Sequence, residues 1–247
     1  MILRAELLRF SRSAALPSLL FIAVGLNVLS VYGTSVQMGD AASSAVSDQA
    51  QTIKLVGLGF GASLFAMIFG ALSVTRDFTS RAVGRVQLLV GSSNRLLGSR
   101  ATVVAPAMLA FGVLGAASAV ITAWLALPGA GSRFVWSHDA TVITLGIVFS
   151  TVFAGYLGQL VAWQVRRSLV AVIVLVAWTL LLETYLIQLI PSVGRFLPGG
   201  LGQAMLEDTS GTDEILSAGW GYVGYVVWLV VLSGLAVWRL RKTDLAQ

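Results

Sequence analysis

The sequence predicts an all-α, polytopic membrane protein with six transmembrane helices. Its 247 residues are 57% hydrophobic and 11% charged, with a mean hydropathy of +0.86. One water-soluble core cannot bury that much apolar surface. Long stretches without a charged residue also recur along the chain, and about 20 helical residues suffice to cross a hydrocarbon layer of roughly 30 Å. We therefore expect residues 1–247 to form a single transmembrane domain.

The predicted elements begin with a helix on the membrane surface. Residues 1–13 place Leu3, Leu7 and Phe10 on one helical face, which is typical of an interfacial helix. An uncleaved signal-anchor with a basic flank is the alternative. The six spans are predicted near residues 14–33, 55–74, 101–127, 140–163, 169–190 and 218–238. Charge-free stretches support five of them, whereas the fifth contains Glu183.

The basic residues predict the orientation of these spans. Thirteen of the sixteen Lys and Arg residues lie on the side that holds both termini, while most acidic residues lie in the opposite loops. Because Lys and Arg accumulate in cytoplasmic loops, we expect both termini in the cytoplasm. The net charge of +5 is then a topology signal, and no nucleic-acid partner is expected. Trp163 and Trp238 are predicted at the inner boundary, where indole rings prefer to lie.

The glycine-rich stretch GLGFGAS, residues 57–63, is predicted to serve helix packing. It lies inside an apolar span, with no preceding strand and no following lysine, so it does not fit a phosphate-binding loop. Gly57 and Gly61 have the small-xxx-small spacing that lets a second helix approach closely. The chain's two lysines, Lys54 and Lys242, lie outside any such loop. We therefore expect that the chain is not an enzyme and that any ATP hydrolysis belongs to a partner.

An intramembrane hydrolase is a remote alternative. Ser63 would be its nucleophile, but such chemistry needs a histidine within hydrogen-bond reach, and His138 is predicted in an outer loop. A Ser63 hydroxyl bonded to the helix backbone is favoured. The chain has no cysteine and a single histidine, so a metal site is also disfavoured.

The segment after the second span is predicted to form an amphipathic helix over residues 77–89. Asp77, Thr79 or Ser80 can cap its start, and Arg81 and Arg85 share its basic face. Its apolar face is formed by Ala82, Val83, Val86, Leu89 and Val90. Such a helix would lie on the inner membrane surface. An ordinary basic loop is the alternative.

A family resemblance rests first on this segment. Residues 73–104, SVTRDFTSRAVGRVQLLVGSSNRLLGSRATVV, resemble the segment after the second span of ABC-2 type permeases, the membrane subunits of G-type (type V) ABC exporters. Asp77 and Phe78 match its opening, Leu88 and Leu89 its leucine pair, and Arg95 and Arg100 its basic exit. The family often has glutamate where Asp77 stands, and proline where this chain has residues 91–93.

The second half of the resemblance lies in residues 181–205, LLETYLIQLIPSVGRFLPGGLGQAM. They are similar to the glutamate, Leu-Pro and Leu-Pro-Gly-Gly elements that many bacterial members have between the fifth and sixth spans. Thr184 stands where the family usually has proline. The resemblance extends to the topology of the whole chain and implies a bacterial plasma (inner) membrane protein.

The resemblance implies how the chain would work. Two permeases, either two copies of this chain or this chain with a paralogue, would dock on two separately encoded cytoplasmic ABC ATPases. ATP and Mg would bind to those ATPases, and this chain would hold no cofactor itself. The implied ATPase-coupling residues are Asp77, Phe78, Arg81, Val83, Arg85, Leu88, Leu89, Arg166 and Arg167. ATP-driven closure would switch the permease dimer between inward and outward opening.

The resemblance also implies a substrate route between the second and fifth spans. Its candidate lining residues are Phe65, Phe69, Trp178, Leu182 and Tyr185, for which a packing or lipid-facing role is the alternative. Drugs, peptide antibiotics and lipid-like molecules are all compatible cargo. The outer gate would be formed by Glu183, Pro191, Phe196, Pro198, Gly199 and Gly200. The fifth span is expected to end near Glu183, with residues 184–205 packing back as a re-entrant outer element.

Glu183 also supports an alternative function. A charged side chain inside a span is costly, about 2.5 to 3.5 kcal/mol on insertion scales, and often marks an ion or proton site. An ion-coupled secondary carrier that uses Glu183 is therefore the second hypothesis. The sequence contains no visible inverted repeat of the kind that many such carriers have.

Overall fold

The computed structural model describes residues 15–40, 47–79, 93–206 and 216–244. These residues are helical and include no strand, which confirms the predicted all-α class. Six of the helices are long and apolar enough to cross a membrane, so the chain is a multi-pass membrane protein. The predicted interfacial helix over residues 1–13, and residues 80–92 of the predicted amphipathic helix, lie outside the described residues.

The six candidate spans extend beyond most of the predicted apolar cores. They cover Ala15–Gly39, Asp48–Arg76, Leu97–Ala130, His138–Val165, Ser168–Leu189 and Ala218–Leu240. The first is α2 (Ala15–Asp40), the third continues from α6 (Ser93–Ala126) into η2 (Leu127–Ala130), the fourth is α7 (His138–Val165), and the sixth is α12 (Ala218–Asp244). The helices run on into polar flanks because Ser47 and Ser137 cap α3 and α7 through their side-chain oxygens.

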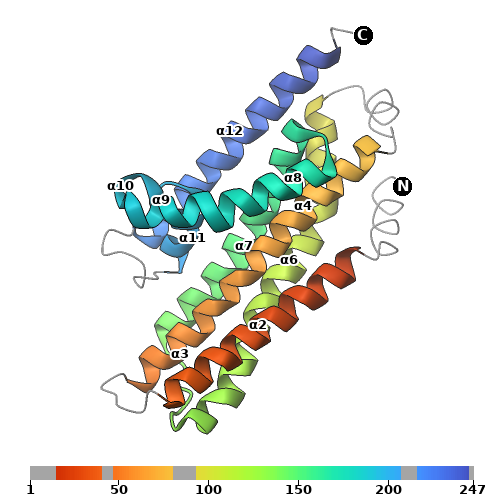
Figure 1. Cartoon of the computed structure of the whole chain (residues 1–247). Coiled ribbons are helices and arrows are strands. Elements are labelled where there is room, and N and C mark those ends of the chain that lie inside the picture. The colour runs from red at the N-terminus through yellow and green to blue at the C-terminus, as the bar shows by residue number, and fades with distance from the viewer. Residues whose placement is uncertain (1–14, 41–46, 80–92, 207–215, 245–247) are drawn as a thin grey trace.

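Two spans consist of several helical pieces. The second span is α3 (Asp48–Gly57), the 3₁₀ turn η1 (Leu58–Gly61) and α4 (Ala62–Thr79). The fifth span is α8 (Ser168–Ala177), the π-helical segment η3 (Trp178–Glu183) and α9 (Thr184–Leu189). Two short helices, α10 (Pro191–Gly194) and α11 (Pro198–Met205), follow before α12. Figure 1 shows α8 and α9 running across the bundle that α2, α4, α6 and α7 form.

The centre of the molecule is formed by spans two, three and four. Between 44% and 56% of their most apolar windows is buried, against 17% to 22% for spans one, five and six. Asn27 of α2 joins the first three spans, because its side-chain Nδ2 donates to the carbonyl oxygens of Gly59 and Gly115, each at 3.4 Å. The Asn27 hydrogen bond to Gly59 lies in η1, where the 3₁₀ turn changes the direction of the backbone carbonyl groups.

Glycines allow α4 and α7 to pack at very short range. A Cβ added at Gly70 would collide with the carbonyl oxygen of Gly155, and one added at Gly158 would collide with the carbonyl oxygen of Met67. Backbone approaches backbone here, as in other membrane helix pairs with small residues at the contact. The predicted close packing is found at Gly61, where an added Cβ would meet Asn27 Oδ1 of α2 at 3.0 Å, but not at Gly57, where it meets nothing within 4 Å. Gly59, between them, is packed against Ala119 and Ile147.

The two ends of the bundle differ in charge. Alternating spans bring the end of α4, the start of α6, the end of α7 and the end of α12 to one end. We call this the basic end; its basic residues include Arg76, Arg95, Arg100, Arg166, Arg167, Arg239 and Lys242. The opposite end has fewer basic residues and includes Asp48, Lys54, Arg133, His138 and Asp139.

Candidate functional site

Three side chains form a cluster at the basic end. Phe78, in the last turn of α4, meets Trp163 of α7 edge to face, with ring centroids 5.4 Å apart and an interplanar angle of 80°. The guanidinium carbon of Arg166 lies 5.6 Å from the centre of the Phe78 ring, within cation–π range. Phe78, Trp163 and Arg166 are called the basic-end cluster below. It joins two segments that are far apart in the sequence.

The backbone at Arg166 places this cation on the ring. Arg166 ends α7 in a left-handed conformation with φ 60°, and its N–H donates to the carbonyl oxygen of Ala162 at 2.9 Å. That conformation usually belongs to glycine at helix ends and costs an ordinary residue free energy. The contact with Phe78 helps to offset that cost. Arg167 follows in an extended conformation and precedes α8.

The structure locates the predicted coupling residues only in part. Phe78 and Arg166 lie together, whereas Arg81, Val83, Arg85, Leu88 and Leu89 lie outside the described residues. Asp77, Thr79 and Ser80 were the alternative caps predicted for the start of a new helix. Asp77 is excluded because α4 continues through it to Thr79, and Ser80 lies outside the described residues. A continuous helix has no free N–H groups for Asp77 to cap.

A second arrangement surrounds Glu183. Its side chain is 2% exposed and lies at the end of η3, where the helix widens to π-type hydrogen bonds. The hydroxyl of Thr184 supports this register by donating to the carbonyl oxygen of Thr179, five residues earlier, at 3.1 Å. The Glu183 carboxylate accepts a hydrogen bond from the backbone N–H of Gly199. Gly199 lies in the first turn of α11, whose free amides favour a negative charge.

The predicted break at Glu183 is wrong. The helix continues from η3 through α9 and ends at Leu189, where Ile190 leaves helical geometry before Pro191. A π-type turn accommodates one extra residue per turn without ending the helix. Glu183 does accept a hydrogen bond from a backbone amide, but that amide comes from α11 rather than from its own interrupted helix.

The chain after Pro191 turns back and packs against its neighbours. A Cβ added at Gly200 would collide with the carbonyl oxygen of Gly194, and one added at Gly146 of α7 would collide with that of Met205. Trp228 of α12 donates from Nε1 to the carbonyl oxygen of Phe196 at 2.9 Å, while half of the Phe196 side chain stays exposed. Pro198, Gly199 and Gly200 start α11, which packs on α7 and α12, while α10 packs on α9.

The five predicted substrate-route residues do not share one surface within the chain. Phe69 is 2% exposed and packs on Phe111, with ring centroids 5.6 Å apart, in a cluster of buried residues from spans one, two and three that Phe65 also joins. Leu182 and Tyr185 are exposed and Trp178 is half-buried. Span five instead meets span two where the Thr179 hydroxyl lies 3.8 Å from the Met67 sulfur.

Two other candidate sites have little geometric support. Ser63 is buried in the first turn of α4, about fifteen helical residues or roughly 22 Å along the second span from its start at Asp48. His138 is exposed in the first turn of α7, at the same end of the bundle as Asp48 and therefore far from Ser63. Among the described residues, no group of three or more His, Cys, Asp or Glu side chains is arranged to hold a metal ion.

The sequence analysis did not single out Asn27, whose amide links three spans, or the buried amide of Gln159. Asn27 and Gln159 are both nearly fully buried, and Trp163 was expected only as a boundary residue. A single amide within a charge-free span was the available signal, since polar groups in membrane helices need partners.

No protein-family model matches the chain, and no curated protein matches it significantly.

Proposed function

We propose that this chain is the permease subunit of an ABC-2 type exporter in a bacterial plasma membrane. It would work with a second permease, a copy of itself or a paralogue, and with cytoplasmic ATPases that bind ATP and Mg. The dimer would move an apolar or amphipathic substrate out of the cytoplasm or inner leaflet by alternating access. The resemblance of residues 73–104 and 181–205 suggests this function, and the six-span architecture is compatible with it.

The basic-end cluster is the observation that supports the proposal best. The resemblance implies two ATPase contacts, one beginning at Asp77 and one at Gln164–Arg167. Phe78 belongs to the first contact and Arg166 to the second, and their side chains touch at the same end of the bundle. A partner that binds one segment would therefore also press on the other.

The packing behind this cluster suits the transmission of movement. Phe78 continues directly from α4, and α4 meets α7 backbone to backbone at Gly70 and Gly158. Close-packed helices move as one body rather than deforming continuously. A displacement at the basic-end cluster would thus tilt spans two and four together, as alternating access requires.

The first test concerns docking. We expect Arg81→Glu and Arg85→Glu to reduce complex formation with the proposed partner ATPase, or to reduce the ATPase activity that the chain stimulates, because both place a negative charge where that partner would meet a positive one. Co-purification and the rate of ATP hydrolysis in reconstituted vesicles measure the two effects. Arg133→Glu makes the same charge change on an exposed residue at the opposite end and should leave both quantities unchanged.

Full complex formation and full stimulated hydrolysis in Arg81→Glu and Arg85→Glu would overturn the docking segment. An equal loss in Arg133→Glu would show a general effect of charge instead.

Phe78→Ala tests the link between the two contacts: we expect binding to persist while stimulated hydrolysis falls, since the segment stays but its packing on Trp163 is lost.

An ion-coupled carrier is the second candidate, favoured by one observation. Glu183 is a carboxylate inside a span, 2% exposed, and such groups often mark ion pathways. Its bond to Gly199 gives the carboxylate a structural role as well. Transport that persists with an ATPase whose catalytic glutamate is replaced, yet stops when the pH gradient is removed, would favour the carrier. Transport that stops with that inactive ATPase favours the exporter.

A further inference from the structure

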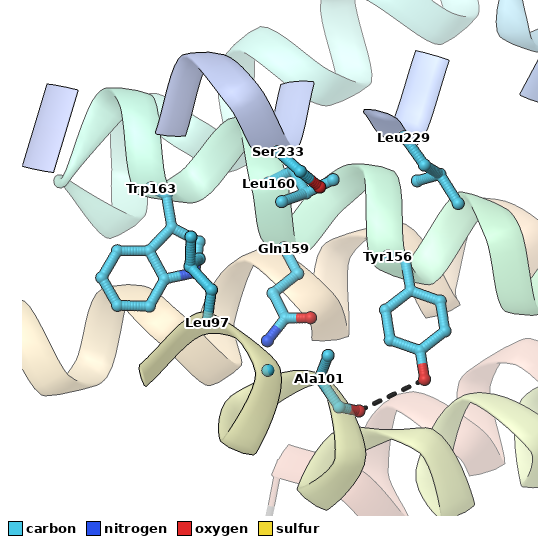
Figure 2. Close-up of a pocket in the computed structure, with 9 residues that line it drawn as sticks. Leu97, Ala101, Tyr156, Gln159, Leu160, Trp163, Leu229 and Ser233 are labelled. Atoms are coloured by element: carbon cyan, nitrogen blue, oxygen red, sulfur yellow. Dashed lines mark hydrogen bonds between the residues drawn. The ribbon is translucent and has the colours of Figure 1, made fainter. Parts of the chain in front are cut away.

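A cavity of about 230 Å³ lies between α6, α7 and α12, near the basic end. Figure 2 shows its walls: Leu97 and Ala101 come from α6, Leu229 and Ser233 from α12, and Gln159 and Trp163 from α7. It shares Trp163 with the basic-end cluster but includes neither Phe78 nor Arg166. It also lies apart from the second and fifth spans, where the resemblance implies the substrate route.

Two buried hydrogen-bond donors, the Gln159 amide and the Trp163 indole, line this cavity. Gln159 and Trp163 are each 3% exposed. The indole N–H of Trp163 has no hydrogen-bond partner among the described residues. Figure 2 shows the Gln159 amide pointing towards α6, and no hydrogen bond joins it to the other residues drawn there. The nearby Tyr156 hydroxyl is satisfied, since it donates to the carbonyl oxygen of Ala101 at 3.2 Å.

An unpaired donor at this place favours an occupant that accepts hydrogen bonds. A polar group without a partner in a membrane interior costs several kcal/mol, so we expect a bound molecule to supply a hydrogen-bond acceptor. The remaining walls are mostly aliphatic, which suits hydrocarbon. Pockets for drug-sized molecules are usually about 300 to 1,000 Å³. A cavity of about 230 Å³ therefore fits part of a larger amphipathic molecule better than a whole drug.

The depth of Gln159 and Trp163 in the membrane indicates which part of an amphipathic molecule would reach them. The 28 residues of α7 rise about 42 Å, so a centred helix extends roughly 6 Å beyond a hydrocarbon core of about 30 Å at each end. Gln159 lies about 9 Å and Trp163 about 3 Å from the end of α7 at Val165. The two donors thus lie about 3 Å to either side of the hydrocarbon boundary, the level at which the glycerol esters of phospholipids are found.

We propose that this cavity binds the ester region of a membrane phospholipid from the leaflet at the basic end. An ester carbonyl oxygen accepts hydrogen bonds from the Gln159 amide and the Trp163 indole. The acyl chain that follows lies against the aliphatic walls at Leu97 and Leu229. This inference requires only that the chain spans a membrane, so it can be correct or wrong independently of the proposed exporter function.

The test compares two lipids that differ in the proposed acceptor. The full chain is purified in detergent, supplied with diester phosphatidylglycerol or its diether analogue, washed, and examined by native mass spectrometry. We expect a diester lipid to remain bound and the diether lipid, which has no ester carbonyl, to be retained several-fold less. Gln159→Leu should reduce diester retention about fivefold, as expected for the loss of one hydrogen bond of about 1 kcal/mol.

A second variant tests the space without removing a donor. Gly98 lines the cavity on α6, and a Cβ there would meet no atom within 4 Å, so Gly98→Leu has room to fold. The added side chain should exclude both lipids equally. Gln188→Leu, the same change as at Gln159 but at an exposed site in α9, is the control and should retain lipid as the unmodified chain does.

Three results would overturn the proposal. Equal retention of diester and diether lipid by the unmodified chain would exclude the carbonyl as the recognised group. Unchanged diester retention in both Gln159→Leu and Gly98→Leu would place any bound lipid elsewhere. The absence of retained lipid from the unmodified chain would leave water as the occupant of the cavity.

Discussion

At the scale of single residues, Glu183 holds two parts of the chain together. The carboxylate lies in span five and accepts a hydrogen bond from Gly199 in α11, sixteen residues later. A Cβ at Gly199 would meet the Glu183 carboxyl carbon at 2.8 Å, so the glycine also makes room for the side chain. The charge therefore has a structural explanation that does not require proton transport.

Replacement of this residue separates hydrogen bonding from charge. We expect Glu183→Leu to lower the free energy of unfolding by about 1 to 3 kcal/mol, because the Gly199 N–H would be left buried without an acceptor. Glu183→Gln keeps a carbonyl oxygen at the same place and should be tolerated, with assembly and ATP hydrolysis nearly intact. Thermal unfolding in detergent measures the stability difference. Equal stability of the two variants would show that the carboxylate is incidental.

At the scale of elements, the contact between α4 and α7 is set by glycine. Gly70, Gly155 and Gly158 lie where these helices cross, and Gly155 also makes room for the side chain of Met108 from α6. Small side chains strengthen membrane helix contacts because hydrocarbon does not drive the helices together and close packing has to. The rigidity proposed for spans two and four depends on this contact.

A single methyl group tests that contact. We expect Gly158→Ala to lower the free energy of unfolding by about 1 to 3 kcal/mol, because the new Cβ meets the backbone of Met67 and the helices must separate. Unfolding of the purified chain, followed by circular dichroism, measures the loss.

Gly25→Ala in α2 is the matched control, since a Cβ there meets nothing within 4 Å. That change should be neutral or raise helix stability by up to about 1 kcal/mol. A Gly158→Ala chain as stable as Gly25→Ala would contradict the close packing of α4 on α7.

At the scale of the whole molecule, charge separates the two ends of the bundle. The described ends of α4, α7 and α12 and the start of α6 contribute Arg and Lys, whereas the start of α7 holds His138 and Asp139. Because basic loops stay in the cytoplasm, this asymmetry predicts the orientation.

The absence of cysteine makes the orientation directly measurable. We expect a single cysteine at His138 to react with an impermeant maleimide in intact cells, because this exposed residue lies at the end of the bundle opposite the basic end, which we predict to face outward. A single cysteine at Lys242, exposed near the end of α12, should react only after the membrane is opened. The reverse pattern would invert the topology and remove the basis for a cytoplasmic ATPase contact.

Much of the fold was predictable because its signals are local. The six spans follow from apolar length, since a helix that crosses hydrocarbon must be continuous and uncharged enough to remain there. The candidate site was predictable only in parts. Phe78, Arg166 and Glu183 could be named from the sequence, but the contact between Phe78 and Arg166 joins residues that no local pattern relates.

Contacts between helices could not be predicted from the sequence, because they depend on how the helices pack together. Helical periodicity put Phe65 and Phe69 on one face of the second span, but the neighbour of that face depends on how the bundle assembles. Phe69 packs on Phe111 and is buried, whereas Leu182 and Tyr185 remain exposed. Likewise, glycine spacing predicted close contacts at Gly57 and Gly61. The structure has close contacts at Gly59 and Gly61 but none at Gly57, because the 3₁₀ turn rotates the backbone.

Composition, apolar length and charge asymmetry determined that this chain is a helical membrane protein with six candidate spans, because the cost of placing polar groups in hydrocarbon acts on each segment separately. The partners of Glu183, Asn27 and Phe78, and the place of Gln159 in a cavity, came from the tertiary structure. Their contacts depend on which helices lie side by side, and that choice is made by the close packing of small residues and by paired polar groups across the bundle.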